Sequence, residues 1–324
     1  MKKGIKIGIA VLLTGLLLSG CGTTTKKKVT IGVLQLVTHP ALDAALTGMT
    51  DYLKAQGYDE SQVTIVVKNA GGDGPTAALI AQQFVTDKVD LIYAIATPAA
   101  QAAYNAVQGT KIPVVFNAVT DAVSAGIVTS NEKPGGQVTG VSDAAPLNLQ
   151  VKLIRDFLPT AKKIGMLYNV GEVNGKIQVD QVKALAPAQG FEIVAIGVSA
   201  TTEISAAAQQ LASQVDCIYN ITDNMVVGAT SVIVDKANAK KIPVFAAEDG
   251  GMSQGLLASD GLSYTKLGKQ AGVIVVDVLF KGKKPADIPV QTATDTALSI
   301  SAGVAKALNI TIPEALKTRA TMLD

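Results

Sequence analysis

The chain of 324 residues contains one histidine, two cysteines and no tryptophan. Histidine is the side chain that most often serves as a general acid or base, and it is the commonest metal ligand in proteins. With His39 alone available, most acid–base and metal chemistry is excluded, and we expect neither catalytic residues nor a metal. A phosphate loop of the form Gly-x-x-x-x-Gly-Lys is absent, and residues 71–74 lack the spacing of a dinucleotide fingerprint, so we expect no cofactor.

One run matches an enzyme motif. Residues 251–255 read Gly-Met-Ser-Gln-Gly, the pattern of the nucleophile elbow in α/β hydrolases. That fold needs a histidine after the serine along the chain, and none follows Ser253. We interpret the run as a glycine-rich turn, and a hydrolase is disfavoured.

Arginine is also scarce, with only Arg155 and Arg319, and both lie in segments that we expect to be peripheral. Hydroxyl groups and backbone amides are therefore expected to bind any carboxylate of a ligand. The sequence has 28 basic and 26 acidic residues, and removal of residues 1–20 takes three lysines and leaves a net charge of −1. Without a concentrated positive field, we expect no nucleic-acid partner.

Residues 1–20 have the features of a lipoprotein signal peptide. Lys2 and Lys3 begin a basic region, and residues 7–18 are apolar but too short to span a membrane permanently. Small residues precede Cys21, as cleavage by a lipoprotein signal peptidase requires. We expect lipidation of Cys21 and a flexible tether over residues 21–28, which would anchor the protein to the cell membrane on its extracytoplasmic face. The alternative is an ordinary secretory peptide with an incidental cysteine.

Short β-branched runs alternate with longer helical stretches over the rest of the chain. This alternation predicts parallel sheets with right-handed crossovers. A first set has strands at 29–37, 63–68, 91–96 and 113–118, with helices at 42–56, 76–86 and 99–107. A second set has strands at 163–168, 192–198, 216–221 and 243–247, with helices at 147–157, 177–188, 204–214 and 226–240. We predict an α/β fold of two doubly wound parallel-sheet domains, because about 300 mature residues exceed one usual core.

The connection between the two sets is expected to act as a hinge. Residues 122–146 are rich in Gly, Pro, Ser and Asn, and we interpret them as a linker rather than a further strand and helix. Residues 256–260 and a helix at 266–282 are expected to return to the first sheet, and residues 296–308 to supply a last strand and helix. The predicted lobes are 29–142 plus 259–291, and 143–258 plus 292–324, joined by a multi-strand hinge that permits closure around a ligand.

Several motifs stand out by their order and spacing. They are Thr38-His39-Pro40-Ala41-Leu42-Asp43, Val119-Thr120-Asp121, Thr139-Gly140-Val141-Ser142-Asp143, Tyr168-Asn169 with Glu172 and Asn174, Thr222-Asp223-Asn224, Lys281-Gly282-Lys283-Lys284-Pro285-Ala286-Asp287, and Ile310-Thr311-Ile312-Pro313. Together they resemble the ABC-transporter substrate-binding family whose better-known members bind tryptophan and other aromatic amino acids. The resemblance covers essentially the whole mature chain. It implies a periplasmic-binding-protein-like type I fold, with an ABC permease and an ATPase as partners.

Two positions depart from the family pattern. The family often has Asp-Pro where this chain has Asp121-Ala122, and Asn-Ser where it has Asn174-Gly175. These departures bear on the identity of the ligand more than on the fold.

Ligands of parallel α/β sheets bind beyond the carboxyl ends of the strands, and two facing lobes bring both sets of strand ends to one cleft. We therefore predict ligand contacts from polar residues near strand ends and in the motifs above. The candidates are Thr38, His39, Asp43, Thr97, Asn117, Thr120, Asp121, Ser142, Asp143, Asn169, Glu172, Asn174, Asp223, Asn224 and Glu248.

The first lobe is predicted to bind the carboxylate of a zwitterion. Thr97 begins a helix, and the N-terminus of a helix attracts negative charge; the alternative is that Thr97 only caps that helix. His39 has two equally good interpretations, as a ligand contact or as a local structural residue before the next helix. Thr97 is not expected in a core.

The second lobe is predicted to bind the ammonium group. Asp223, helped by Asn224 and Glu172, is the first candidate, and Glu248 or Asp249 comes next. The alternative for each acid is that it caps a helix or forms a turn. Asp223 is not expected in a core.

The function predicted from these observations is that of a monomeric solute-binding lipoprotein of an ABC importer, not an enzyme. Its ligand is expected to be an aromatic or other apolar amino acid. A sugar or nucleoside is the first alternative, although such sites usually stack a ring on an aromatic side chain and tryptophan is absent. A surface adhesin is the second alternative.

Overall fold

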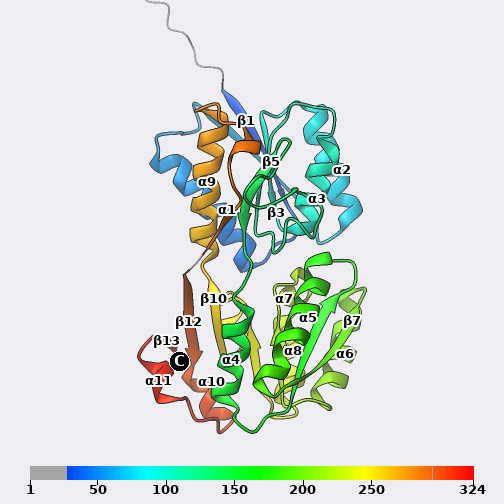
Figure 1. The fold of residues 1–324 in the computed structure, drawn as a ribbon, viewed down its shortest axis with the longest axis vertical. Helices are drawn as coiled ribbons and strands as arrows, with labels where there is room; N and C mark the ends of the chain where they lie inside the picture. The colour runs from blue at the N-terminus through cyan, green and yellow to red at the C-terminus, as the bar shows by residue number, and fades with distance from the viewer. Residues whose placement is uncertain (1–27, 294) are drawn as a thin grey trace, which may run out of the picture.

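The structure is a computed structural model that describes residues 28–293 and 295–324. The predicted signal peptide, Cys21 and all of the tether except Lys28 lie outside the described residues. The described chain forms two α/β lobes, one above the other in Figure 1. In these described ranges no helix has the length and apolar character that a membrane crossing requires.

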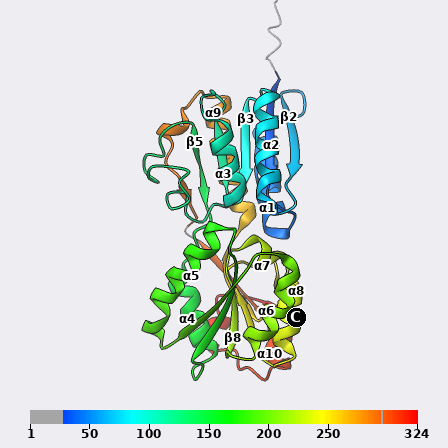
Figure 2. The same cartoon turned by 90° about the vertical axis from the view of Figure 1, so that its right-hand side faces the viewer.

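The N-terminal lobe has a six-stranded parallel sheet in the order β11-β5-β4-β3-β1-β2. Its strands are β1 (Val29–Gln35), β2 (Val63–Asn69), β3 (Leu91–Ile95), β4 (Val114–Asn117), β5 (Val138–Ser142) and β11 (Gln291–Thr292). Its helices are α1 (Pro40–Ala55), α2 (Gly74–Thr86), α3 (Thr97–Ala106) and α9 (Tyr264–Leu279). Helices α1 and α9 pack together on one face of the sheet, and α2 and α3 pack together on the other (Figures 1 and 2). The central strands β3 and β4 are therefore buried along their whole length.

The C-terminal lobe has a seven-stranded sheet in the order β13-β12-β10-β9-β8-β6-β7. Its strands are β6 (Lys163–Asn169), β7 (Glu192–Val198), β8 (Cys217–Asn220), β9 (Val244–Ala246), β10 (Ala258–Leu262), β12 (Thr296–Ser301) and β13 (Ala320–Leu323). Only the β10–β12 pair is antiparallel among the pairs of the described strands. The helices are α4 (Leu147–Phe157), α5 (Val173–Leu185), α6 (Ile204–Ala212), α7 (Asn224–Gly228), α8 (Thr230–Asn238), α10 (Ala302–Ala307) and α11 (Glu314–Lys317).

Two strands differ from the prediction. Residues 138–142, expected to be part of a linker, form β5 and pair with β4. The strand expected to return to the first sheet at 256–260 instead forms β10, which pairs with β9 and β12 in the C-terminal lobe. The N-terminal lobe therefore receives α9 and β11 from this part of the chain, but not β10. The helix expected at 226–240 is divided into α7 and α8 at Ala229.

The chain passes between the lobes at three places, from β5 to α4, from β10 to α9 and from β11 to β12. The second crossing leads into α9, which packs tightly against α1. A Cβ atom on Gly48 would meet the carbonyl oxygen of Thr265, and one on Gly268 would meet that of Ala45. Glycine at these two positions therefore allows the backbones of the two helices to approach closely.

Candidate functional site

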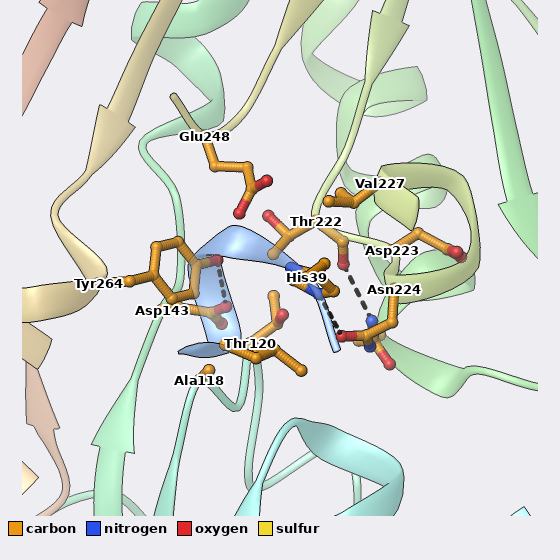
Figure 3. A pocket seen from close by; sticks show the side chains of 12 residues that line it. His39, Ala118, Thr120, Asp143, Thr222, Asp223, Asn224, Val227, Glu248 and Tyr264 are labelled. Atoms are coloured by element: carbon orange, nitrogen blue, oxygen red, sulfur yellow. Dashed lines mark hydrogen bonds between the residues drawn. The ribbon is translucent and has the colours of Figure 1, made fainter. Parts of the chain in front are cut away.

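A small cavity lies between the lobes, where strand ends of both sheets meet. The N-terminal lobe contributes segments after β1 and β4, and the C-terminal lobe contributes segments after β8 and β9. The lining residues are His39, Leu42, Ala118, Thr120, Asp143, Asn174, Thr222, Asp223, Asn224, Val227, Glu248 and Tyr264 (Figure 3). Three of the twelve are carboxylates, and none is lysine or arginine.

His39 connects the two lobes. It occupies the position before α1, and its Nε2 lies 3.3 Å from Oδ1 of Asn224 in the C-terminal lobe. Burial lowers the pKa of His39, so the ring is neutral at physiological pH. Since the amide oxygen can only accept, Nε2 carries the hydrogen and donates to it. Its Nδ1 is buried and has no hydrogen-bond partner among the described residues.

Asp143 and Tyr264 meet at the hinge. Asp143 follows β5 at the first crossing, Tyr264 begins α9 at the second, and the Tyr264 hydroxyl donates to Oδ2 of Asp143 over 2.8 Å. Both side chains are buried, and burial raises the pKa of Asp143. The other oxygen, Oδ1, has no partner among the described residues.

Glu248 enters the cavity from the segment after β9 and is 3% exposed. Burial, with smaller contributions from the carboxyls of Asp249 and Asp143, raises its pKa to about 8. Its Oε2 has no hydrogen-bond partner in the described part of the chain. A cation bound beside a buried carboxylate of this kind stabilises its charged form.

Asp223 has both oxygens occupied. Oδ1 accepts the backbone N–H of Val226 over 3.1 Å as the cap of α7, and Oδ2 accepts the N–H of Asn169 over 2.7 Å. Burial and the nearby Glu172 raise the pKa of Asp223, while these two N–H groups oppose the rise. The residue is fully buried, so the expectation that it lies outside a core is wrong.

Glu172 organises the same corner of the lobe. Its carboxylate accepts the side-chain amides of Asn169 over 3.2 Å and Asn224 over 2.5 Å. It also accepts the backbone N–H groups of Asn224 and Met225, each over 3.3 Å. Glu172 therefore stabilises the start of α7 together with Asp223.

Gly175 explains one departure from the family pattern. A Cβ atom at this position would collide with Oδ2 of Asp223, so the serine that the family often has would displace that carboxylate. The preceding Asn174 lines the cavity, where its Nδ2 donates to the carbonyl oxygen of Thr222 over 2.9 Å and its Oδ1 has no partner among the described residues.

Thr97 is the first residue of α3 and is 2% exposed, so the expectation that it lies outside a core is also wrong. Its side chain does not cap the helix, and its Oγ1 is a buried oxygen without a partner among the described residues. The preceding Ala96 has φ of 85°, a left-handed conformation that favours glycine, as does Ala118 with φ of 57° at the end of β4. Strain of this kind is common next to binding sites.

The structure brings seven of the predicted site residues into the cavity lining: His39, Thr120, Asp143, Asn174, Asp223, Asn224 and Glu248. The other eight lie outside the lining: Thr38, Asp43, Thr97, Asn117, Asp121, Ser142, Asn169 and Glu172. Several of these eight have structural partners. Asp43 accepts from Gln35 over 2.7 Å, Asn117 donates to the Tyr93 hydroxyl over 2.8 Å, and Ser142 donates to the Thr120 carbonyl over 3.0 Å.

Five lining residues were missed: Leu42, Ala118, Thr222, Val227 and Tyr264. Leu42 and Val227 are apolar residues in the first turn of α1 and α7. An apolar residue at such a position could line a cavity or pack in a core, and the sequence does not distinguish the two. Tyr264 directly follows Ser263, whose side chain caps α9. The capping serine marks the start of a helix, and this is the feature of the sequence that could have pointed to Tyr264.

Both arginines are peripheral, as expected. Arg155 donates to the carbonyl groups of Leu158, Pro159, Ala161 and Gln189. Arg319 pairs with the buried Asp260 of β10 over 2.6 Å. Over residues 28–293 and 295–324, no group of His, Cys, Asp and Glu side chains is arranged to hold a metal ion.

Residues 30–323 match the family model of ABC transporter substrate binding proteins. The chain belongs to this family. A tyrosine-binding protein of Clostridioides difficile (strain R20291) is 42% identical over 323 residues, which covers 95% of this chain and 93% of that protein. As a member of the family, the protein is the extracytoplasmic substrate-binding component of an ABC transporter and binds a small ligand.

Two solved structures bear on the arrangement of the lobes. A domain from Streptococcus pneumonia in complex with L-Trp is 38% identical, covers 92% of this chain and 100% of its own, and has a TM-score of 0.88. The ligand-free, open structure of a substrate binding protein with adhesive properties from Clostridium difficile is 40% identical, covers 91% and 99%, and has a TM-score of 0.69. Since the identities are nearly equal, the lobes here lie closer to the arrangement in the L-Trp complex than to the open one.

Proposed function

We propose that this substrate-binding protein captures an amino acid with an aromatic or other apolar side chain in the interlobe cavity and delivers it to the permease of an ABC importer. The observation that supports this most is the charge of the cavity, whose lining has three carboxylates, a neutral histidine and no lysine or arginine. Apolar contact is available from Leu42, Ala118 and Val227. Relatives named for tyrosine binding and solved with L-Trp point to the same class of ligand.

A zwitterion suits the two sides of the cavity. The N-termini of α1 and α3 offer positive partial charge for a carboxylate from the N-terminal lobe, and the Thr97 hydroxyl at the start of α3 has no partner in the described part of the chain. The acids of the hinge and the C-terminal lobe offer negative charge for an ammonium group. The fifteen residues predicted from the sequence remain our proposal for the groups that bind or organise the ligand.

A ligand screen by thermal unfolding tests this function. The probes are the twenty common amino acids, with myo-inositol, ribose and adenosine as the sugar and nucleoside controls. A ligand at 100 times its Kd stabilises a protein by about 2.7 kcal/mol, so the cognate amino acid should raise the melting temperature by several degrees. Stabilisation by adenosine or a sugar alone, with no amino acid active, would overturn the proposal.

We further propose that the mature protein is a monomer, attached to the membrane through lipid on Cys21, and that it binds rather than transforms its ligand. The tether and the small residues before Cys21 support the anchor. The single histidine supports binding over catalysis, because it is neutral, buried and engaged with Asn224.

Adhesion is a second candidate function, favoured by one observation. The 40% identical relative solved in open form is described as having adhesive properties. The test measures attachment of the purified protein to cultured epithelial cells, against a lipid-free bovine albumin control. Attachment no greater than that of albumin would exclude this function.

A further inference from the structure

We propose that Asp143 and Glu248 form a cation subsite in the cavity, and that a ligand ammonium group bound there is what permits the lobes to close over these two acids. The inference rests on the proposed function and assigns the charged end of the ligand to particular atoms. It also explains how the protein distinguishes an occupied cleft from an empty one.

The first argument is the supply of free acceptor atoms. Oδ1 of Asp143 and Oε2 of Glu248 are buried and without hydrogen-bond partners in the described part of the chain. Buried carboxylate oxygens are normally paired, because loss of their hydration costs free energy that only a donor or cation restores. A primary ammonium group has three donors, enough for both oxygens and one further acceptor.

The second argument excludes the other acids of this region. Both oxygens of Asp223 accept backbone N–H groups, and Glu172 accepts amides of Asn169 and Asn224. In Figure 3 the carboxylate of Asp223 points away from the centre of the cavity, whereas that of Glu248 points into it, toward the side where Tyr264 and Asp143 lie. Asp223, predicted from the sequence to bind the ammonium group, thus already uses both oxygens in hydrogen bonds within its own lobe.

The third argument concerns where the two acids sit. Asp143 lies at the crossing from β5 to α4, and its partner Tyr264 lies at the crossing from β10 to α9. Glu248 follows β9 in the C-terminal lobe. The subsite is therefore built from two hinge segments and one lobe. A group bound there contacts the C-terminal lobe and both hinge segments at once, and it holds them together in the closed arrangement.

The fourth argument is electrostatic. Closure without a cation buries the charges of Asp143 and Glu248 together, with no lysine or arginine in the lining to balance them. The raised pKa values of both groups express this cost. The groups that act on these two acids are the Asp249 carboxyl and the hydroxyls of Tyr264 and Thr120, and the neutral His39 also lines the cavity. None of them supplies positive charge. A ligand ammonium group balances the two negative charges and removes this cost of closure. Without ligand the cost remains, and it favours the open arrangement of the lobes.

The variants Glu248→Gln and Asp143→Asn test the proposal, because each keeps the shape of the side chain and removes its charge. The matched control is Asp235→Asn, which removes an exposed carboxylate of α8 in the same lobe that does not line the cavity. Calorimetry with L-tyrosine, tyramine and the des-amino acid 3-(4-hydroxyphenyl)propanoate measures recognition of the ammonium group. Small-angle scattering of the ligand-free proteins measures closure.

We expect L-tyrosine to bind Glu248→Gln at least about 30-fold more weakly than wild type, and the preference for L-tyrosine over the des-amino acid to shrink by a similar factor. We expect ligand-free Glu248→Gln to have a smaller radius of gyration than ligand-free wild type, with Asp235→Asn like wild type. Asp143→Asn should show the same two effects, and it serves as the second variant if Glu248→Gln does not fold.

Equal affinity of wild type and both variants for L-tyrosine, or ligand-free variants as expanded as wild type, would overturn the cation subsite while leaving the proposed function intact. If wild type binds none of the amino acids, the proposed function fails. The scattering comparison then still decides the inference, since it needs no ligand.

Discussion

The acids around the cavity divide into two kinds according to what their oxygens do. Asp223 and Glu172 accept hydrogen bonds from N–H groups of the C-terminal lobe, whereas Asp143 and Glu248 each keep one oxygen without a partner among the described residues. We therefore expect the first kind to contribute to stability and the second, under the proposed cation subsite, to recognition of the ligand. This difference leads to opposite expectations for substitutions at neighbouring places in one cavity.

Replacement of Asp223 by alanine should destabilise the protein even without ligand. The change removes the cap of α7 and leaves the N–H groups of Asn169 and Val226 buried without their acceptor. Loss of a cap costs about 1 kcal/mol, and an unsatisfied buried donor costs about 1–3 kcal/mol. We expect the free energy of unfolding to fall by about 2–4 kcal/mol in urea titrations. An unchanged urea midpoint would show that the two bonds contribute nothing.

The cavity acids should also make closure depend on pH. Since burial raises the pKa of Glu248 from 4.5 to about 8 in the closed form, that form binds a proton more tightly than the open one. Asp143 acts in the same direction. Closure without ligand should therefore become more favourable as the pH falls from 8 to 6.5. Below 6.5 the lowered pKa of His39 opposes the trend, because that ring must stay neutral when buried.

Scattering of the ligand-free protein at pH 8 and pH 6.5 measures this effect. One proton bound over this interval changes the ratio of closed to open molecules by at most about 30-fold. The radius of gyration should be smaller at pH 6.5 for wild type and should change less for Glu248→Gln. A radius that grows on acidification would contradict the sign of the argument.

At the scale of elements, the contact between α1 and α9 holds the N-terminal lobe to the hinge. Gly268→Ala should destabilise the protein by about 1–3 kcal/mol, because the added methyl group meets the backbone of Ala45, which cannot turn aside. Gly228→Ala is the control, because it also adds a methyl group to a helical glycine. Gly228 is exposed at the end of α7, and a Cβ atom there would meet nothing within 4 Å. Equal melting temperatures for the two variants would contradict the close approach of the helices.

The alternation of strands and helices was predictable because it depends on local apolar patterns. The two wrong assignments, β5 and β10, contain buried polar residues that such patterns do not anticipate. Thr139 of β5 donates to the carbonyl of Ile288 over 2.7 Å, and the β10 carbonyl of Asp260 accepts Gln150 over 2.9 Å. These partners lie more than a hundred residues away in sequence, so no local pattern reveals them.

The residues of the candidate site were likewise predictable only where their role depends on local sequence. His39, Asn224 and Glu248 were found because they follow strands, and strand ends face the cleft in this kind of fold. Tyr264 was missed because its role depends on Asp143, which is 121 residues earlier in the chain. The free oxygen of Glu248 and the occupied oxygens of Asp223 became distinguishable only from the contacts around them.

At the scale of the whole molecule, the interlobe contact of His39 with Asn224 and the higher TM-score to the L-Trp complex both describe lobes that have come together. The three crossings then act as one hinge, with Asp143 and Tyr264 at its inner edge. The described chain begins at the other end of the N-terminal lobe, where β1 starts (Figure 1), and the proposed lipid anchor would join the protein on that side.

Cys21→Ala should release the protein from the membrane without altering its fold, since the described lobes begin after the tether. The expected result after a salt wash is wild type in the membrane fraction and the variant in the soluble fraction. The matched control is Cys217→Ala, because Cys217 is buried in β8 and no lipid is expected there. Retention of both variants at the wild-type level would contradict acylation of Cys21.

The late return of the chain to its first lobe also sets an order of events during synthesis. Helix α9 contributes buried residues such as Leu267 and Val275 to the core of the N-terminal lobe, yet it is complete only at residue 279 of 324. Strand β11, which extends the same sheet, follows still later. A nascent chain therefore lacks one side of its first core until most of it has been translated. Since the protein acts outside the cytoplasm, this delay would leave its first lobe incomplete, and so easier to export, while the rest of the chain is still being made.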